Sequence, residues 1–341
     1  MKPVRFSVVG INHNHIFGQV NCLIAAGAEF VGFHAAEDDL AAEFSGIYPY
    51  VQRYDDPRRA YDDPQIDLIV TAAIPADRAA IALAAMRADK DVMTDKPGMT
   101  TLDQLTEIRR VQKETGRIFS VLYSEHFENR ATVKAGELVA AGAIGKVVST
   151  AGFGPHRMRP ASRPAWFFER ERYGGILVDI ASHQCEQFLF FTGADAAEIL
   201  SASVGNRAHP QWPGLQDSGD IHLSTGNATG FIRVDWFTPD GLPTWGDGRL
   251  FITGTQGMIE LRKYVDIAGR PGGDHLFLTD ATGVTHIDCA DVALPYGPQL
   301  VADIRDRTET AMPQARCFAA MEIALKAQAR AEAQISGGAH A

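Results

Sequence analysis

Short apolar segments alternate with longer helical segments through the first 123 residues of this 341-residue chain. Five of them have the composition and length of buried strands: 4–10, 29–34, 66–74, 91–95 and 117–123. Helical segments such as 77–88 and 101–115 lie between them, and Gly116 is placed to end the second of these helices. Because strands that alternate with helices pair in parallel, we predict a doubly wound parallel sheet.

The pattern changes after the fifth strand. Segment 130–141 is predicted to be a helix, and the residues beyond it are mostly strand-like, with glycine-containing turns between the strands. Apolar and charged side chains alternate in 229–237, as in a strand with one buried face. We predict a mostly antiparallel sheet closed by an Ala-rich helix at about 314–334. The expected fold is therefore α/β with two domains, 1–123 and 124–335, and its last helix packs on the second domain or back on the first.

Composition narrows the function classes. The net charge of −10 and a pI near 5.5 argue against a general nucleic-acid or anionic-membrane binder. No apolar stretch is long enough to span a bilayer, and the N-terminus lacks the pattern of a signal peptide. The four cysteines have no C-x-x-C spacing, which is typical of thiols in a reducing compartment. We predict a cytoplasmic protein.

The segment GINHNHIFGQV, residues 10–20, lies where a dinucleotide-binding fold carries G-x-G-x-x-G. Gly10 supplies the first glycine, whereas Asn12 and His15 occupy the other two positions. Asn12 tolerates left-handed backbone angles, and N–H groups at a helix start can hold phosphate whatever the side chains are. The residues by themselves are compatible with a modified cofactor loop and with a plain strand-to-helix turn. We expect no metal at His13 and His15, because no carboxylate or cysteine ligand is evident nearby.

The end of the second strand bears on the choice of cofactor. An acidic residue there would bind the ribose hydroxyls of NAD. His34 holds the place, with Glu37 and Asp38 just beyond it, although His34 is equally an ordinary strand-end residue. No arginine is adjacent in sequence to form a 2′-phosphate pocket, unless Arg53 folds in. This favours NAD over NADP.

Two further motifs carry ionisable groups. TDKPG, residues 94–98, follows an apolar strand, so Pro97 fixes Lys96 near the carboxyl edge of the sheet, where open parallel sheets bind ligands. In GGILVDIASHQ, Asp179 and His183 are four residues apart, which on one helix would place them on the same face of an apolar segment. The alternatives are a solvated lysine and a core histidine bonded to Asp179.

These motifs resemble those of the glucose–fructose oxidoreductase, inositol dehydrogenase and rhizopine-catabolism (Gfo/Idh/MocA) family. DKP at 95–97 resembles its EKP signature, and GGILVDIASHQ resembles its GG-x-x-x-D-x-G-x-H signature. The resemblance extends to GTQGMIELR at 254–262. It implies a Rossmann domain, a second α/β domain with a large open, mostly antiparallel sheet that often mediates oligomerisation, and hydride transfer between NAD(P) and a secondary alcohol of a sugar or cyclitol. Asp95 and Arg78 depart from the pattern, which often has Glu and His there.

The resemblance also implies roles for single residues. Lys96, Asp179 and His183 fall on the family's catalytic lysine, aspartate and histidine. His183 would accept the hydroxyl proton, Lys96 would stabilise the developing alkoxide, and Asp179 would position the substrate or share in the proton transfer. The expected cofactor-binding residues are Gly10, Asn12, His13, His15, His34, Ala73, Pro75, Arg78, Asp95, Lys96 and Pro97.

The segment 155–172 precedes the Asp179 motif and is rich in arginine and aromatic residues. Arginine suits carboxylates and aromatic rings suit sugar faces, so we expect this segment to line the substrate site. The alternative is a surface loop whose arginines pair with nearby glutamates. The expected substrate-binding residues are His126, His156, Arg157, Arg163 and Trp166.

Two other functions remain open for the same pattern. One is a sugar lyase or glycosidase that retains NAD and oxidises its substrate transiently; the other is a non-catalytic NAD(P)/sugar sensor. The expected partner is a small polyol, sugar or sugar acid, with no nucleic acid and no membrane. We also expect a homodimer or homotetramer formed through the second sheet.

Overall fold

The computed structural model describes residues 2–338. Within this range no helix combines the length and the hydropathy needed to cross a membrane. The chain divides into two compact units. The first contains the residues up to Leu122 together with Pro295–Phe318, and the second contains Tyr123–Leu294 and the residues from Ala319 onward. The segment 295–318 thus groups with the first unit, although the sequence pattern alone assigned it to the second domain.

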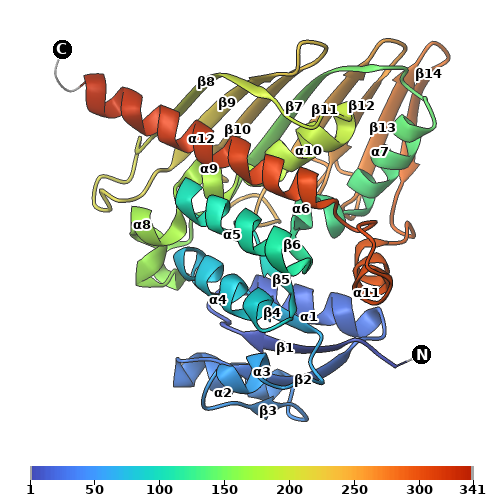
Figure 1. The fold of residues 1–341 in the computed structure, drawn as a ribbon. Coiled ribbons are helices and arrows are strands. Elements are labelled where there is room, and N and C mark those ends of the chain that lie inside the picture. The colour runs from blue at the N-terminus through green and yellow to red at the C-terminus, as the bar shows by residue number, and fades with distance from the viewer. Residues whose placement is uncertain (1, 339–341) are drawn as a thin grey trace. The chain divides into compact units, whose positions relative to one another are not determined.

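The described part of the first unit is built on a six-stranded parallel sheet of order β3-β2-β1-β4-β5-β6 (Figure 1). Its strands are β1 (Arg5–Val9), β2 (Glu29–His34), β3 (Gln52–Arg53), β4 (Leu68–Thr71), β5 (Asp91–Asp95) and β6 (Phe119–Leu122). Strands β4, β5 and β6 are buried along their whole length, as expected when helices cover both faces. The order reverses between β1 and β4, so the carboxyl ends of these two strands form the switch point at which such sheets bind ligands.

Helices connect these strands as predicted. The connecting helices are α1 (His15–Ala25), α2 (Asp38–Ile47), α3 (Arg58–Tyr61), α4 (Pro75–Arg87) and α5 (Leu102–Thr115). Helix α11 (Tyr296–Asp306) also lies in this unit, and α12 (Gln314–Gly338) begins in it. The side chain of Thr101 caps the first turn of α5, and Gly116 ends the helix at a φ of 64°. The prediction that Gly116 stops this helix is therefore confirmed. Helix α11 belongs here because it packs on α1, and Arg307 beyond it pairs with Asp91 at 2.7 Å.

The second unit carries an eight-stranded sheet of order β14-β13-β12-β11-β7-β10-β9-β8. Every pairing is antiparallel except that of β7 with β10. Its strands are β7 (Val147–Pro155), β8 (Glu198–Gly205), β9 (Ser218–Ser224), β10 (Thr229–Asp235), β11 (Arg249–Gly254), β12 (Met258–Arg262), β13 (His275–Asp280) and β14 (Gly283–Asp288). The predicted fold class, a doubly wound parallel sheet followed by a large, mostly antiparallel one, is confirmed.

Helices pack on one face of this second sheet, where α10 lies over β7 and β10 and α7 lies over β12 and β13 (Figure 1). The helical segments are α6 (Ser124–Phe127), α7 (Arg130–Ala140), two 3-10 turns (Pro160–Ser162 and Ala165–Phe168), α8 (Arg170–Tyr173), α9 (Ile176–Asp179) and α10 (Ser182–Thr192). The alternation in β10 places Ile232 and Val234 in the core, while Arg233 is exposed. The helix-covered face is thus the apolar face.

Candidate active site

The loop between β1 and α1 lies at the carboxyl edge of the first sheet. The Gly10 N–H donates to the carbonyl of His34 at 3.0 Å, and the Gly10 carbonyl accepts from the N–H of Ala72 at 3.1 Å. Gly10 has a φ of 82°, and a Cβ built on it would lie 2.5 Å from the Cβ of Ala73. Only glycine satisfies both conditions, so the backbone passes close to the end of β4, as it does in loops that hold a pyrophosphate. This geometry fits a dinucleotide.

A partly buried cluster of charged and imidazole groups lies beside this loop. Asp95, at the end of β5, accepts a bond from His15 (Nδ1 to Oδ1, 2.8 Å) and pairs with Arg78 (Nη2 to Oδ2, 3.0 Å). The Nδ1 of His13 lies 3.6 Å from the same carboxylate. Burial opposes ionisation of Asp95, but His15 and Arg78 outweigh it and hold the pKa of Asp95 well below its usual range. Burial and the neighbouring His15 lower the pKa of His13.

Asp95 also corrects one step of the sequence reasoning about metals. We expected no metal at His13 and His15 because no carboxylate was evident nearby, but the fold places Asp95 beside both, and the three residues have the donor atoms to hold a cation. The guanidinium of Arg78 already neutralises this carboxylate. We therefore interpret the cluster as an ion-pair network.

Arg78 connects this network to the predicted catalytic lysine. Its side chain is fully buried, and it donates from Nη1 to the carbonyls of Lys96 (2.5 Å) and Pro97 (3.0 Å) and from Nε to the carbonyl of Ala73 (2.7 Å). The Lys96–Pro97 peptide is cis. Arg78 therefore holds the backbone of the lysine turn from inside the protein. Pro75 is the first residue of α4, the helix that carries Arg78.

Polar groups gather at the end of β2. The Nδ2 of Asn12 donates to Glu37 (Oε1, 2.8 Å), which brings a half-buried carboxylate to the modified loop. Arg53 folds onto this turn, a possibility that the sequence left open: its Nη2 donates to the carbonyl of Ala35 (3.1 Å) and to Asp38 (2.7 Å). His34 bonds through Nδ1 to the carbonyl of Tyr54 at 3.1 Å.

Asp179 and His183 do not share one continuous helix. Asp179 ends α9, and His183 lies in the first turn of α10 after a break at Ile180 and Ala181. In the break the Ala181 N–H bonds to the carbonyl of Ile176 at 3.4 Å, and the His183 N–H bonds to the carbonyl of Ile180 at 3.1 Å. The single helical face expected for the two residues is therefore wrong. Both side chains are nonetheless buried, with 9% and 1% exposure.

The two glycines before α9 set the direction of this segment. Gly174 and Gly175 have φ values of 92° and 90°. A Cβ on Gly175 would lie 2.4 Å from the side-chain amide of Gln328 on α12. Gln328 accepts from the N–H of Leu177 at 3.0 Å, so the start of α9 is fixed against α12. The GG of the motif is thus required by backbone conformation and by close packing.

A buried ion pair lies close to His183. Glu125 on α6 accepts from Lys263 (Nζ to Oε2, 2.7 Å) and from Gln184 (Nε2 to Oε2, 2.9 Å). Glu125 and Lys263 are each about 1% exposed at the side chain. Burial alone would raise the pKa of Glu125, but Lys263, followed by His183 and His156, lowers this pKa to about 2. Glu125 is thus a carboxylate whose field reaches His183.

Lys263 was not predicted as a site residue, although its position in the strand pattern pointed to it. Ile259 and Leu261 are fully buried on β12, and a strand period of two puts Lys263 on the same face. A lysine in the buried phase of a strand needs a partner of opposite charge. Here that partner is Glu125.

The predicted substrate residues differ in their surroundings. Arg163 lies over the rings of Phe167 (4.5 Å) and Trp236 (5.1 Å), and burial lowers its pKa while Asp179 acts in the opposite direction. Trp166 is half-buried and contacts Phe167 edge to face. His156 packs against Trp236 and Trp245.

Two other predicted residues are held inside the second unit. The Nη2 of Arg157 donates to the carbonyls of Pro239 (2.8 Å) and Leu242, so Arg157 supports that loop. His126 bonds to the buried Glu186 (Nδ1 to Oε2, 2.8 Å). A pocket of about 510 Å³ adjoins Arg157, and its lining includes Met158, Arg159, His209, Trp236, Thr238 and Asp240.

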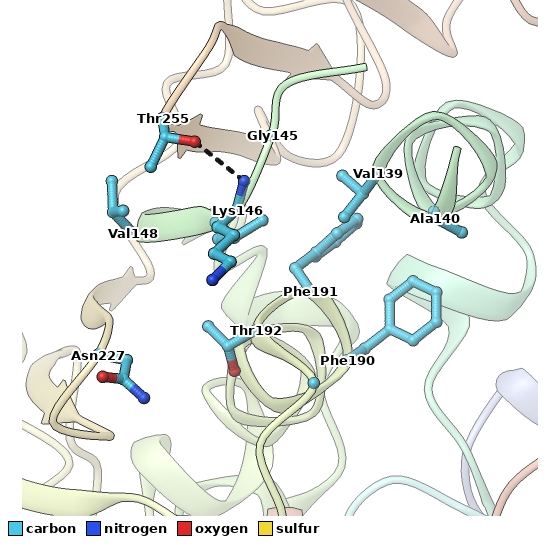
Figure 2. Close-up of a pocket in the computed structure, with 13 residues that line it drawn as sticks. Val139, Ala140, Gly145, Lys146, Val148, Phe190, Phe191, Thr192, Asn227 and Thr255 are labelled. Atoms are coloured by element: carbon cyan, nitrogen blue, oxygen red, sulfur yellow. Dashed lines mark hydrogen bonds between the residues drawn. The ribbon is translucent and has the colours of Figure 1, made fainter. Parts of the chain in front are cut away.

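A larger pocket of about 690 Å³ lies at the C-terminal end of α10 (Figure 2). Phe191 and Val139 form its apolar side, while Lys146, Thr192 and Asn227 lie across from them. Thr255 accepts from the N–H of Lys146 at 3.1 Å. None of the predicted site residues lines this pocket, so we assign it no part in the reaction.

Comparison with known proteins places these observations in a family. Residues 5–123 match a model described as an oxidoreductase family with an NAD-binding Rossmann fold, and residues 132–260 match the GFO/IDH/MocA C-terminal domain. The chain belongs to the GFO/IDH/MocA oxidoreductase family. The family resemblance drawn from the DKP and GG motifs is therefore confirmed.

Several GFO/IDH/MocA relatives are similar over different lengths. A candidate oxidoreductase from Erwinia carotovora atroseptica SCRI1043, known from a crystal structure, is 44% identical, with a TM-score of 0.94 over 96% of this chain and 98% of that one. D-xylose dehydrogenase of Paenarthrobacter nicotinovorans is 32% identical over 53% of this chain and 46% of its own. The chain spans about half the length of the curated relatives it matches. Levoglucosan dehydrogenase with NADH shares the fold, with a TM-score of 0.79 at 18% identity over 98% of each chain.

Proposed function

We propose that this protein is an NAD-dependent oxidoreductase that transfers hydride between a secondary alcohol of a sugar, cyclitol or sugar acid and nicotinamide. One observation carries the proposal: hydrogen bonds join three loops at the carboxyl edge of the first sheet. The Gly10 carbonyl accepts from the N–H of Ala72, and Arg78 donates to the carbonyls of Ala73 and Lys96. An NAD-binding family model covers the same residues. The names of the relatives, D-xylose and scyllo-inositol dehydrogenases among them, support a polyol or sugar substrate.

The chemistry follows from the charges of three side chains. The Gly10 loop and the turns after β2 and β4 would hold NAD, which would supply the hydride acceptor. His183 accepts the proton of the alcohol hydroxyl, since an imidazole titrates near neutral pH. The ammonium of Lys96 donates a hydrogen bond to the same oxygen and stabilises its developing negative charge. Asp179 orients the substrate, together with Arg163, on which its charge acts.

Glu37 is the residue that we propose selects NAD. It bonds to Asn12 in the modified loop, three residues beyond the position at the end of β2 where an acidic residue is usual. A carboxylate there accepts the ribose hydroxyls and repels a 2′-phosphate, while Asp38 already pairs with Arg53. We expect Glu37→Gln to lower the preference for NAD over NADP, measured as the ratio of kcat/KM values, by about 10-fold.

The matched control for this prediction is Glu43→Gln, which removes an exposed carboxylate from α2, the helix that begins directly after Glu37. It should leave the ratio unchanged. An unaltered ratio in Glu37→Gln, or NADP preference in the unmodified protein, would remove Glu37 from this role.

Substrate recognition is assigned to the second unit. Arg163 presents a half-buried cation held by two aromatic rings, which suits a carboxylate or hydroxyl-rich ligand. Trp166 and His156 add flat surfaces of the kind that contact sugar rings. We propose that Arg157 and His126 support this surface without contacting the substrate. Arg157 bonds to a loop carbonyl, and His126 bonds to a buried carboxylate.

Glu125 sets the pH range in which His183 works. The negative charge of Glu125 favours the protonated form of His183. Glu125 also interacts with the titratable groups of Lys263, His156 and Tyr264. Because oxidation of an alcohol needs neutral His183, removing this charge extends activity to lower pH. We expect Glu125→Gln to move the acidic limb of the kcat–pH profile down by up to about one unit.

Glu332→Gln serves as the control for that profile. Glu332 is a carboxylate of the same unit and pairs with Arg170 (Nη2 to Oε2, 3.0 Å). Its replacement should leave the acidic limb in place. A limb that moves equally in both variants, or in neither, would show that Glu125 does not act on His183.

The proposed reaction is tested with a panel of polyols, aldoses and sugar acids, supplied with NAD or NADP, while reduced nicotinamide is followed. Net reduction with at least one compound is the expected result. A sugar lyase or glycosidase that retains NAD would convert a sugar without net reduction. A sensor would bind cofactor and sugar and convert neither.

We further propose that two copies associate through the uncovered face of the second sheet. Phe153 contacts Phe231 and Phe251 on that face, and all three rings are only half-buried. A cluster of aromatic rings of this kind is typical of a surface that a partner covers. The four cysteines are free thiols, which supports the reducing environment of a cytoplasmic enzyme.

A further inference from the structure

The loop after β1 has only one of the three usual glycines, and the side chains at the other two positions both form hydrogen bonds. The third glycine of such loops allows close packing between helix and strand. Here His15 occupies that position and extends its Nδ1 to Asp95 at the end of β5. The side chain of Asp95 is about 1% exposed, while that of His15 is 36% exposed. The imidazole thus connects the surface of the loop to a carboxylate inside the sheet.

The same carboxylate is fixed from its other side. The Oδ2 of Asp95 pairs with Arg78, whose remaining donors hold the carbonyls of Ala73, Lys96 and Pro97. One buried arginine therefore joins the turn after β4 to the turn after β5, and Asp95 passes this connection on to the loop after β1. In the proposed function the loops after β1 and β4 hold the dinucleotide, and the turn after β5 carries Lys96.

We propose that His15, Asp95 and Arg78 form a clamp that takes over the work of the missing glycines by holding the β1 loop in the conformation that binds NAD. The clamp rests on the proposed function, because it positions residues for that cofactor. His15 and Arg78 are positioning residues: they act through Asp95 and through the backbone of the loops. A buried charge pair is retained here for the geometry it enforces.

The clamp predicts a specific pattern of NAD affinities, measured by calorimetry on the cofactor-free protein. His15→Ala removes a hydrogen bond to a charged group and is expected to weaken NAD binding about 10- to 100-fold. His15→Asn keeps an N–H donor close to the position of Nδ1 but lacks Nε2, and is expected to restore most of the affinity. Thermal unfolding of each variant checks that the fold is intact, which we expect because His15 is partly exposed.

The outcomes separate the clamp from a direct contact. If His15→Asn binds as weakly as His15→Ala, the ring contacts the cofactor itself and the clamp is wrong. If His15→Ala binds NAD as tightly as the unmodified protein, the clamp is also wrong, while the proposed function stands. If the unmodified protein binds neither NAD nor NADP, both fall. Arg110→Ala, which breaks a surface ion pair with Glu114 on α5, is the control and should not change the affinity.

Discussion

Replacing Lys96 with methionine is expected to lower kcat by about 100- to 1000-fold while NAD affinity changes little. Methionine keeps the length of the side chain and removes the ammonium, so the alkoxide that develops on the substrate loses its stabilising donor. The backbone of the turn should survive, because Arg78 holds it through the carbonyls of Lys96 and Pro97 and not through the lysine side chain. Steady-state kinetics with the best substrate of the panel, together with calorimetry for NAD, measure both quantities.

Lys90→Met is the matched control for this variant. Lys90 is also a buried lysine of the first unit, and its Nζ donates to the carbonyl of Asp63 at 2.7 Å, away from the cofactor loops. Its loss should leave kcat within about threefold of the unmodified protein, a change of at most about 0.65 kcal/mol in barrier height. Normal turnover in Lys96→Met would exclude Lys96 from the chemical step.

Replacing His183 with asparagine is expected to reduce kcat by about 100- to 10 000-fold, the range for loss of a general base. Asparagine retains hydrogen-bonding capacity at this fully buried position but cannot accept the hydroxyl proton. The acidic limb of the kcat–pH profile should disappear with the imidazole, and this separates loss of a base from loss of packing. NAD affinity should be preserved, because His183 belongs to the second unit.

His222→Asn is the control for His183. His222 is an exposed histidine on β9, in the same unit. Its replacement should leave both kcat and the pH profile unaltered. A variant of His183 that keeps wild-type turnover with its acidic limb intact would exclude the proposed base.

The sheets were predictable because their signals are local. The strands around Val8, Val70 and Met93 each contain a short apolar stretch, and the helices between them carry local start and stop residues such as Thr101 and Gly116. Strand β3 was not predicted, because it consists of only two exposed polar residues at the edge of the sheet.

The site was predictable only in part, because its connections join distant segments. Nothing local shows that His15 and Asp95 meet across 80 residues, or that Lys263 and Glu125 meet across 138. The start of α9 likewise depends on a distant segment, since Gln328 on α12 accepts from the N–H of Leu177. Motifs identified the residue types, and the tertiary fold determined which of them became partners.

A crystal structure of the protein with NADH and a polyol substrate would test the central claim most directly. We predict that the Nζ of Lys96 and a ring nitrogen of His183 both lie about 3 Å from the same carbinol oxygen, over the nicotinamide. A complex in which either group is remote from that oxygen, or in which packed side chains fill the space expected for the nucleotide, would contradict it.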